Sequence, residues 1–368
     1  MKTLAKLTIP TLLALTVYVL ASAEKPNLTN AKVQEVSATA GLKAAVDGVI
    51  QSHDAPLWIG YKIPTTAKDR SMCCDDSWAA LTNGAERSSG CRVEFARGIS
   101  MNDSRTACSP PEPPPYAFMF LRTGNQGDKR IREVRVYSAG CLLDFSGLSV
   151  FWINDVKPEQ SIELLTGLAS ANDDADEDRR EPGHAAVMAI ALHDSMAADA
   201  ALEKLIQPGQ PSGLRNSVAF WLGVERGKRG EELLRKYVKG DGDISFREKG
   251  TFALSQSKAP EALTDLIDMA RHDASSRVRG QAIFWLAQIG GRKEAEQITT
   301  AIEEDPETEV KKKAVFALSQ MHDGEGVPLL IQLARTNSNP VVRKQAIFWL
   351  GQSHDPRALD FLEEILTK

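Results

Sequence analysis

One ten-residue pattern occurs five times in the second half of this chain. The copies read LRNSVAFWLG at 214–223, FREKGTFALS at 246–255, VRGQAIFWLA at 278–287, VKKKAVFALS at 310–319 and VRKQAIFWLG at 342–351, so the period is 32 residues. A weaker copy, HAAVMAIAL, precedes them at 184–192. A fixed period of this length is typical of proteins built from stacked structural repeats.

Each copy predicts an amphipathic helix that is followed by a second helix. In the last copy Val342, Ala346 and Leu350 recur at helical spacing and share one face. Further helical segments follow the copies at 200–206, 231–238, 261–270, 294–302, 327–334 and 358–366. A two-helix unit of this size cannot bury its apolar face alone, whereas stacked units can. The expected fold is mainly α: a right-handed α-solenoid of about six helix pairs over residues 182–368.

The units resemble HEAT repeats, in the short form also found in phycobilisome lyase subunits. That family carries an arginine six residues after an aspartate, and the corresponding pairs here are Asp241/Arg247, Asp273/Arg279, Asp305/Lys311 and Asn337/Arg343. The first unit departs from the pattern, with Gly209 before Arg215. The resemblance implies that these residues form a structural ladder that joins neighbouring units by hydrogen bonds and charge pairing. It covers about half of the chain and specifies a fold without an activity.

Aromatic residues follow the same period in two columns. The first column, expected to lie in the core, is Phe220, Phe252, Phe284, Phe316 and Phe348. The second column holds Trp221, Trp285 and Trp349, which alternate with alanines. This alternation predicts either large–small packing between units or a row of exposed anchors for a partner.

The inner surface of a solenoid is its usual binding surface. We expect the second helices to line it, with outward side chains at Lys204, Arg235, Lys236, Asp268, Thr300, Gln332 and Glu364. Charge along this column runs from basic to acidic. Because the column forms no uniform basic stripe, it does not favour nucleic acid as a partner.

Residues 1–23 have the pattern of a secretory signal peptide. Lys2 and Lys6 precede an apolar stretch, and Ala21-Ser22-Ala23 is a small-x-small cleavage site. The alternative is an uncut membrane anchor, but the apolar run is short for a span. We therefore expect export to the periplasm or the cell exterior after cleavage near Ala23, with no stable membrane insertion afterwards.

Removal of the signal changes the formal charge from −5 to −7, because two lysines are lost. Basic and acidic residues balance over 24–155, so the whole excess lies on the C-terminal part. An acidic excess disfavours proteins that grip phosphates.

Residues 24–155 are expected to form a small α+β domain, followed by a capping helix and acidic linker over 156–181. We predict a helix at 33–50 and strands at 57–63, 117–121 and 131–137. All five cysteines lie in this domain: Cys73, Cys74, Cys91, Cys108 and Cys141. In an exported protein they predict two disulfides and one remaining thiol, with undetermined partners, and adjacent Cys73 and Cys74 are expected to bond elsewhere.

The sequence contains no motif that specifies catalysis or a cofactor. Five of the six histidines precede an aspartate, yet His322-Asp323 and His354-Asp355 fall in predicted turns rather than on helices. The acidic run at 173–178 lacks the glycine and the glutamate of a calcium loop. We therefore expect neither a metal nor another cofactor.

These patterns predict an exported, non-enzymatic protein that binds a protein or peptide through its solenoid. Two alternatives remain: a HEAT-fold enzyme with lyase- or metal-dependent hydroxylase-like activity, and a self-associating structural protein of the envelope. The last alternative rests on the final helix, whose apolar residues Leu359, Leu362, Ile365 and Leu366 have no polar helix after them. We expect the N-terminal domain, a second copy or a partner to cover that end.

Overall fold

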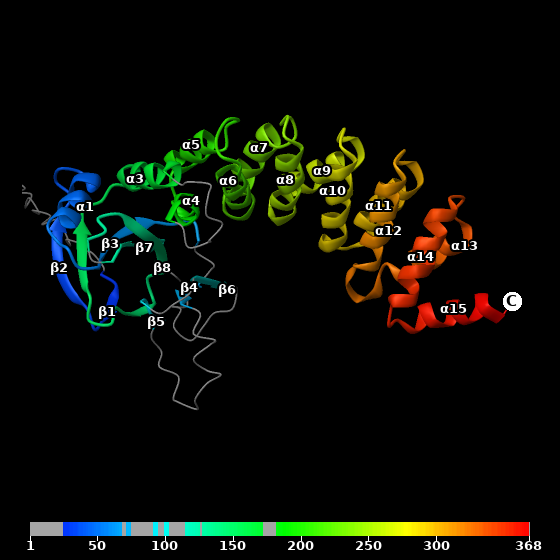
Figure 1. The fold of residues 1–368 in the computed structure, drawn as a ribbon, viewed down its shortest axis with the longest axis horizontal. Coiled ribbons are helices and arrows are strands. Elements are labelled where there is room, and N and C mark those ends of the chain that lie inside the picture. The colour runs from blue at the N-terminus through cyan, green and yellow to red at the C-terminus, as the bar shows by residue number, and fades with distance from the viewer. Residues whose placement is uncertain are drawn as a thin grey trace, which may run out of the picture.

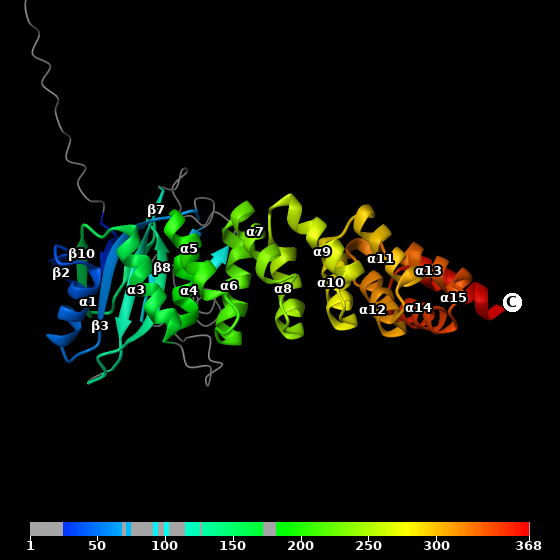
Figure 2. The ribbon, with the colours of Figure 1, turned by 90° about the horizontal axis from the view of Figure 1, so that it is seen from above.

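The computed structural model describes residues 25–67, 71–74, 91–94, 99–102, 115–125, 127–171 and 182–367. A small α/β region is followed by a curved row of helix pairs, which confirms the expected fold class (Figure 1). Viewed from above, the sheet region and the helix pairs succeed one another along the long axis of the molecule (Figure 2). The predicted signal peptide, Cys108 and the acidic run at 173–178 lie outside the described residues.

The N-terminal region is built on a five-stranded mixed sheet with the order β2-β10-β3-β7-β8. These strands span Lys32–Ser37, Ser149–Asn154, Leu57–Pro64, Tyr116–Thr123 and Ile131–Ser138, respectively. Strand β10 is parallel to β2 and β3, whereas β3, β7 and β8 are antiparallel neighbours. The three predicted strands are therefore confirmed.

Two smaller sheets accompany the main sheet. The first has the order β1-β9-β5 and the second pairs β4 with β6. Their strands are β1 (Asn27–Thr29), β9 (Leu142–Asp144), β5 (Cys91–Arg92), β4 (Ser71–Cys74) and β6 (Ile99–Asn102).

The prediction of one helix over 33–50 is wrong in its first half. Residues Lys32–Ser37 form β2, and helix α1 begins only at Leu42 and ends at Gln51. Gly41 separates the two elements with a φ of 95°, a conformation that favours glycine. Pairing of β2 along β10 outweighs the helical spacing of its apolar residues, because tertiary contacts override weak local preference.

The two faces of the main sheet bury different side chains. One face packs with α1 and with α3 (Pro158–Ser170), and its cluster continues into the helix pairs of the solenoid. The opposite face is aromatic and is covered by the smaller strands; it contains Trp58, Phe118, Phe120, Tyr137, Phe145 and Trp152. Gly60 in β3 makes room for it, because a Cβ there would lie 2.6 Å from the Phe120 ring.

Six helix pairs form the solenoid, as predicted. They are α4 (Pro182–Leu192) with α5 (Met196–Leu205), α6 (Ser212–Glu225) with α7 (Gly227–Tyr237), α8 (Ile244–Gln256) with α9 (Pro260–His272), α10 (Ser276–Ile289) with α11 (Arg292–Glu304), α12 (Thr308–Ser319) with α13 (Val327–Thr336), and α14 (Pro340–Gln352) with α15 (Pro356–Thr367).

The first helix of each pair, not the second, lines the inside of the curve. In Figure 1, α6, α8, α10, α12 and α14 lie inside, and α7, α9, α11 and α13 lie outside. The expectation that the second helices form the inner surface is therefore wrong. The inner helices carry small residues where they meet: a Cβ on Gly223 of α6 would lie 2.1 Å from the carbonyl oxygen of Ala253 in α8. Because the first helices of successive units pack closely, the layer that they form is shorter than the outer layer, and the row of units curves toward it.

A buried hydrogen-bond chain fixes the sheet to the first helix pair. Tyr61 of β3 and His193, which follows α4, both lie 3.0 Å from the hydroxyl of Ser161 in α3. The other ring nitrogen of His193, Nδ1, donates to the carbonyl oxygen of Ala189 at 2.7 Å. Burial lowers the pKa of His193 to about 4, so the ring is neutral near pH 7 and Nε2 accepts from Ser161. The sheet and solenoid therefore share a polar contact within a common core.

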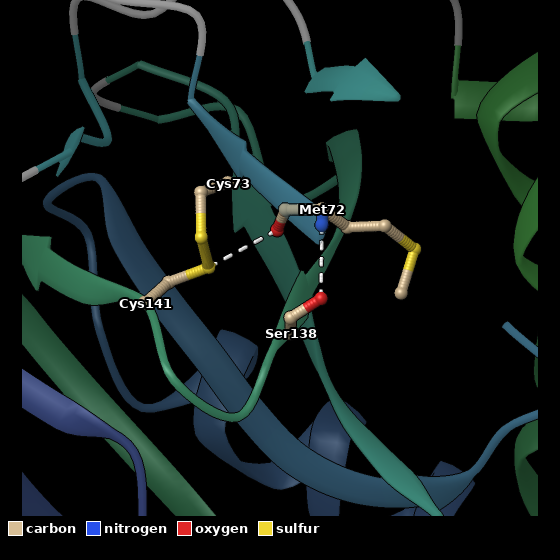
Figure 3. The surroundings of a disulfide bond; sticks show 4 residues. All are labelled: Met72, Cys73, Ser138 and Cys141. Atoms are coloured by element: carbon tan, nitrogen blue, oxygen red, sulfur yellow. Dashed lines mark hydrogen bonds between the residues drawn. A yellow bond between two sulfur atoms is a disulfide. The ribbon is translucent and has the colours of Figure 1, made fainter. Parts of the chain in front are cut away.

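The cysteine predictions are tested at one pair. Cys73 of β4 forms a disulfide with Cys141, 68 residues later (Figure 3). Beside it, the backbone N–H of Met72 donates to the hydroxyl of Ser138 at 2.9 Å. Cys73 is thus bonded to a residue other than its neighbour Cys74, as expected. Among the described residues, no helix is both long and apolar enough to cross a membrane.

Candidate binding surface of the solenoid

An arginine ladder ties the central units together. Arg247 donates from Nε and Nη2 to the carboxylate of Asp273 at 2.8 and 3.0 Å, and Arg279 binds Asp305 in the same way at 2.7 and 3.0 Å. Each Nη1 donates to the backbone carbonyl of the aspartate six residues earlier, at 2.6 and 2.9 Å. Hydrogen bonding to Asp305 raises the pKa of Arg279. The aspartate of one unit thus binds the arginine of the unit before it.

The ladder is modified at its two ends. Arg215 still pairs with Asp241 and donates to the carbonyl of Ile206 at 2.9 Å, although glycine stands at 209. Lys311 donates to the carbonyls of residues 302 and 303 at 2.8 and 2.7 Å. In the central units the aspartate partner lies 26 residues after the arginine. In the unit of Lys311 that position holds Asn337, so lysine replaces the arginine and asparagine replaces the aspartate of the same pair. Arg343 donates to the carbonyl of Asn337 at 2.7 Å.

The phenylalanine column is not core, which corrects our expectation. Phe220, Phe252, Phe284 and Phe316 are half-buried, and Phe348 is 52% exposed. The leucines two positions later, at 222, 254, 286, 318 and 350, are fully buried. Two residues correspond to about 200° around a helix, so both columns cannot face the same core.

The phenylalanines and tryptophans make one continuous row of ring contacts, which we call the aromatic strip. It runs Trp221–Phe220–Phe252–Trp285–Phe284–Phe316–Trp349–Phe348, with successive centroids 5.1, 5.7, 4.6, 5.0, 6.2, 4.9 and 5.0 Å apart. These distances lie in the range of favourable aromatic pairs. The strip crosses α6, α8, α10, α12 and α14, which are the inner helices.

The tryptophans serve mainly as packing elements within the strip. Trp285 reaches back to Phe252 of the preceding unit, and Trp349 reaches back to Phe316. The alanines that alternate with them, at 253 and 317, are buried. The indole N–H groups of Trp285 and Trp349 are buried without a hydrogen-bond partner. The large–small alternation therefore places the phenylalanines, rather than the indoles, toward the inner surface.

Polar side chains border the aromatic strip on both sides. Lys249, Lys313 and Lys344 are exposed and lie one helical turn before Phe252, Phe316 and Phe348. Glutamines occupy the position four residues after the phenylalanines, at 256, 288, 320 and 352. We call the strip together with these two borders the inner face. The sequence shows that these lysines and glutamines recur beside the phenylalanines. Only the structure shows that the helices carrying them lie on the inside of the curve.

The seven residues predicted on the second helices lie on the outer layer instead. Lys204 and Lys236 are exposed there, Asp268 is half-buried, and Lys236 binds Glu203 at 2.8 Å. Arg335 binds the predicted residue Glu364 across α13 and α15. Thr300 donates to the carbonyl of Glu296 within its own helix. The remaining two are Arg235, described next, and Gln332, which is exposed. Their role in binding stays a prediction.

An acidic pair is buried between α7 and α9 of the outer layer. Glu231 is fully buried, with Arg235 Nη2 2.6 Å from its carboxyl oxygen. Burial, together with the neighbouring Asp265 carboxyl, raises the pKa of Glu231 to about 7. Burial also opposes ionisation of Asp265, but hydrogen bonds from Glu231, Arg235 and Lys239 outweigh it and lower the Asp265 pKa. Glu231 therefore keeps its proton to a higher pH than an exposed glutamate does.

Histidines and carboxylates do not gather into a metal centre in the described part of the chain. No group of three or more metal-ligating side chains occurs there. His272, on the outer layer, binds Asp268 on its own helix at 2.9 Å.

Comparisons with known proteins agree with the repeat geometry. Residues 295–368 match a family model for HEAT repeats. This C-terminal segment therefore carries HEAT repeats. No curated protein matches the sequence.

Solved structures to which this chain is similar include the following three. Human deoxyhypusine hydroxylase is 15% identical, with 56% of this chain and 90% of that chain covered and a TM-score of 0.27. The CpcE–CpcF complex of phycocyanin lyase from Nostoc is 17% identical, covers 43% and 97%, and has a TM-score of 0.33. The Escherichia coli protein YibA is 26% identical, covers 53% and 71%, and has a TM-score of 0.34.

Proposed function

We propose that this HEAT-repeat chain is an exported, non-enzymatic scaffold that binds a protein or peptide along its inner face. The observation that supports this proposal is the aromatic strip, which crosses five units and stays partly exposed. A side chain meant only for packing is buried in every interior unit, as the leucines of the same helices are. Half-exposed rings in register offer a partner repeated apolar contacts at low entropic cost.

Rigidity of the scaffold also supports a binding role. The arginine ladder joins successive units through buried charge-assisted bonds. The chain of hydrogen bonds through Ser161 holds the sheet region against the first units. A face that is held in one shape loses little freedom when a partner binds.

Site-specific photo-cross-linking tests the position of the binding surface. A photo-reactive amino acid replaces Gln288 on the inner face in one variant and Arg271 on the outer layer in a second, matched variant. Both are incubated with an extract of the source organism. We expect a discrete adduct at 288 and a much weaker one at 271. Equal adducts at both positions, or an adduct at 271 alone, would refute an inner binding face.

Two further measurements address export and catalysis. N-terminal sequencing of the mature protein is expected to begin near Glu24, and an intact N-terminus would contradict cleavage.

Metal analysis of the purified full-length chain is expected to give well under one tightly bound ion per molecule. About one ion or more per molecule would instead support the enzyme alternative.

Self-association is a second candidate, favoured by the exposed end of the solenoid. Leu366 of α15 is 84% exposed, whereas Ala334, its equivalent one unit earlier, is 8% exposed. The N-terminal region lies at the opposite end and does not cover this helix (Figure 1). If a second copy covers it, light scattering should give a dimer mass that Leu366→Glu converts to a monomer. A monomer mass for the unchanged chain would exclude this candidate.

A further inference from the structure

We infer that the partner segment is acidic and extended, with apolar side chains that lie on the aromatic strip and carboxylates that pair with Lys249, Lys313 and Lys344. This inference rests on the proposed function and specifies the chemistry of the partner. Three observations support it: the inner layer is basic, three of its lysines form no ion pair, and those lysines lie beside the aromatic strip.

Charge differs in sign between the two layers of the solenoid. The inner helices α6, α8, α10, α12 and α14 carry ten basic and three acidic side chains. The outer helices α7, α9, α11, α13 and α15 carry nine basic and twelve acidic side chains. The net acidic charge of the chain therefore hides a basic inner layer, which attracts an acidic segment and repels a basic one.

Five of the ten inner cations already have carboxylate partners, and Lys311 and Arg343 donate to backbone carbonyls. Arg215, Arg247 and Arg279 belong to the ladder. Arg277 binds Glu248 at 2.5 Å, and Lys312 binds Glu309 at 3.1 Å.

Three exposed cations of the inner layer remain available. Lys249, Lys313 and Lys344 form no ion pair with any described residue. They come from α8, α12 and α14, and each lies one turn before a phenylalanine of the strip. An incoming carboxylate would therefore not have to displace an internal partner of these lysines.

The apolar part of the recognition lies beside these lysines. Phe348 and Ile347 on α14 are 52% and 37% exposed. Lys313 extends toward α10, where a Cβ at Gly280 would lie 2.5 Å from its Cδ. Its methylene stem therefore lies across the joint between two units, next to the strip. The glutamines on the other border can donate to and accept from an extended backbone.

Helix spacing sets the sequence spacing of the partner. Packed helices lie about 8–10 Å apart, and an extended chain advances about 3.3 Å per residue. One unit therefore corresponds to about three residues of the partner. Lys249 and Lys313 are two units apart and Lys313 and Lys344 one, so carboxylates about six and then three residues apart match the face.

Fluorescence anisotropy with designed probes tests this inference. The acidic probe is a fluorescein-labelled 14-residue peptide with glutamates at positions 2, 8 and 11, leucines at 4, 6 and 9, and serine or threonine elsewhere. A second probe carries lysines in place of the glutamates. We expect the full-length chain to bind the acidic probe at least about tenfold more tightly than the basic one, with affinity that falls as salt rises.

A charge-matched pair of variants locates the interaction. The variant Lys249→Glu/Lys313→Glu/Lys344→Glu should weaken binding of the acidic probe about tenfold or more. The control Lys62→Glu/Lys228→Glu/Lys258→Glu changes three exposed lysines away from the inner face and should stay within about twofold. Circular dichroism verifies that both variants keep their helical content.

The outcomes separate this inference from the proposed function. Equal binding of both probes, no binding of the acidic probe, or equal losses in the two variants would overturn the acidic partner. If cross-linking at 288 still captures a partner in that case, the inner face remains the binding surface and only its chemistry is wrong. If cross-linking fails as well, the proposed function is wrong.

Discussion

Removal of one ladder arginine should destabilise the solenoid because it strands a buried charge. Arg279 makes two bonds to the Asp305 carboxylate and one to the carbonyl of Asp273. The side chains of Arg279 and Asp305 are only 9% and 4% exposed. Methionine at 279 keeps the length of the side chain but leaves the carboxylate unpaired. Breaking a buried ion pair from one side costs about 3–5 kcal/mol.

The same chain shows how this cost can be relieved. At Lys311 and Asn337 the ladder continues without a carboxylate. Asn337 accepts the backbone N–H of residue 339 at 2.9 Å, as Asp305 accepts that of residue 307 at 2.8 Å. Asp305→Asn therefore keeps the turn and removes the charge. We expect Arg279→Met/Asp305→Asn to cost only about 1–2 kcal/mol and so to be more stable than Arg279→Met alone.

Urea denaturation followed by circular dichroism measures these differences. Arg277→Met is the matched control, two positions away on the same helix, because Arg277 is 64% exposed. Its surface pair with Glu248 should contribute less than about 1 kcal/mol. If Asp305→Asn does not recover stability in the Arg279→Met background, the cost arises from lost packing and the stranded-charge argument is wrong.

Three further predictions concern stability. Because the pKa of Glu231 is raised to about 7 from 4.5, the folded state holds its proton more tightly, and this group lowers stability as pH rises from about 4.5 to 7. Glu231→Gln should therefore gain stability relative to the unchanged chain, on the order of 2–3 kcal/mol between pH 4 and pH 8 in thermal or urea unfolding; a pH-independent difference would contradict this. Gly60→Ala forces a Cβ to within 2.6 Å of Phe120 and should cost about 1–3 kcal/mol, whereas the control Gly48→Ala, with open space around it, should stabilise α1 slightly. Equal unfolding midpoints for these two variants would refute the steric reason. Replacing Cys73 and Cys141 by serine opens a loop of 68 residues and should lower stability by up to about 4 kcal/mol, while identical urea midpoints with and without a reductant would argue against the disulfide.

Repetition made much of the solenoid predictable. A pattern that recurs every 32 residues marks the same local environment five times, so the helix pairs could be placed from the sequence. The ladder residues were implied by the resemblance to HEAT repeats. The sheet region has no such redundancy. Its first apolar segment has helical spacing yet forms β2, because the neighbouring β10 strand comes from residues more than a hundred positions away.

The candidate site was only half predictable. The sequence showed that phenylalanines, tryptophans and lysines share phases, but it does not state which layer of a solenoid is inside. The 200° between the phenylalanine and leucine columns already indicated that one column was not core. The glycine, serine and alanine column at 223, 255, 287, 319 and 351 was a second signal, because small residues allow the inner helices to approach closely.

The sequence by itself determined the repeat unit, its period, its charged ladder positions and the separation of the cysteines from the repeats. Tertiary structure decided that the first helix of each unit lies inside, that the aspartate of one unit binds the arginine of the unit before it, and that the phenylalanine column faces the inner surface. The physical reason is that periodicity describes one helix at a time. Curvature, by contrast, arises from distances between helices, which small side chains and buried ion pairs set only when the units are stacked.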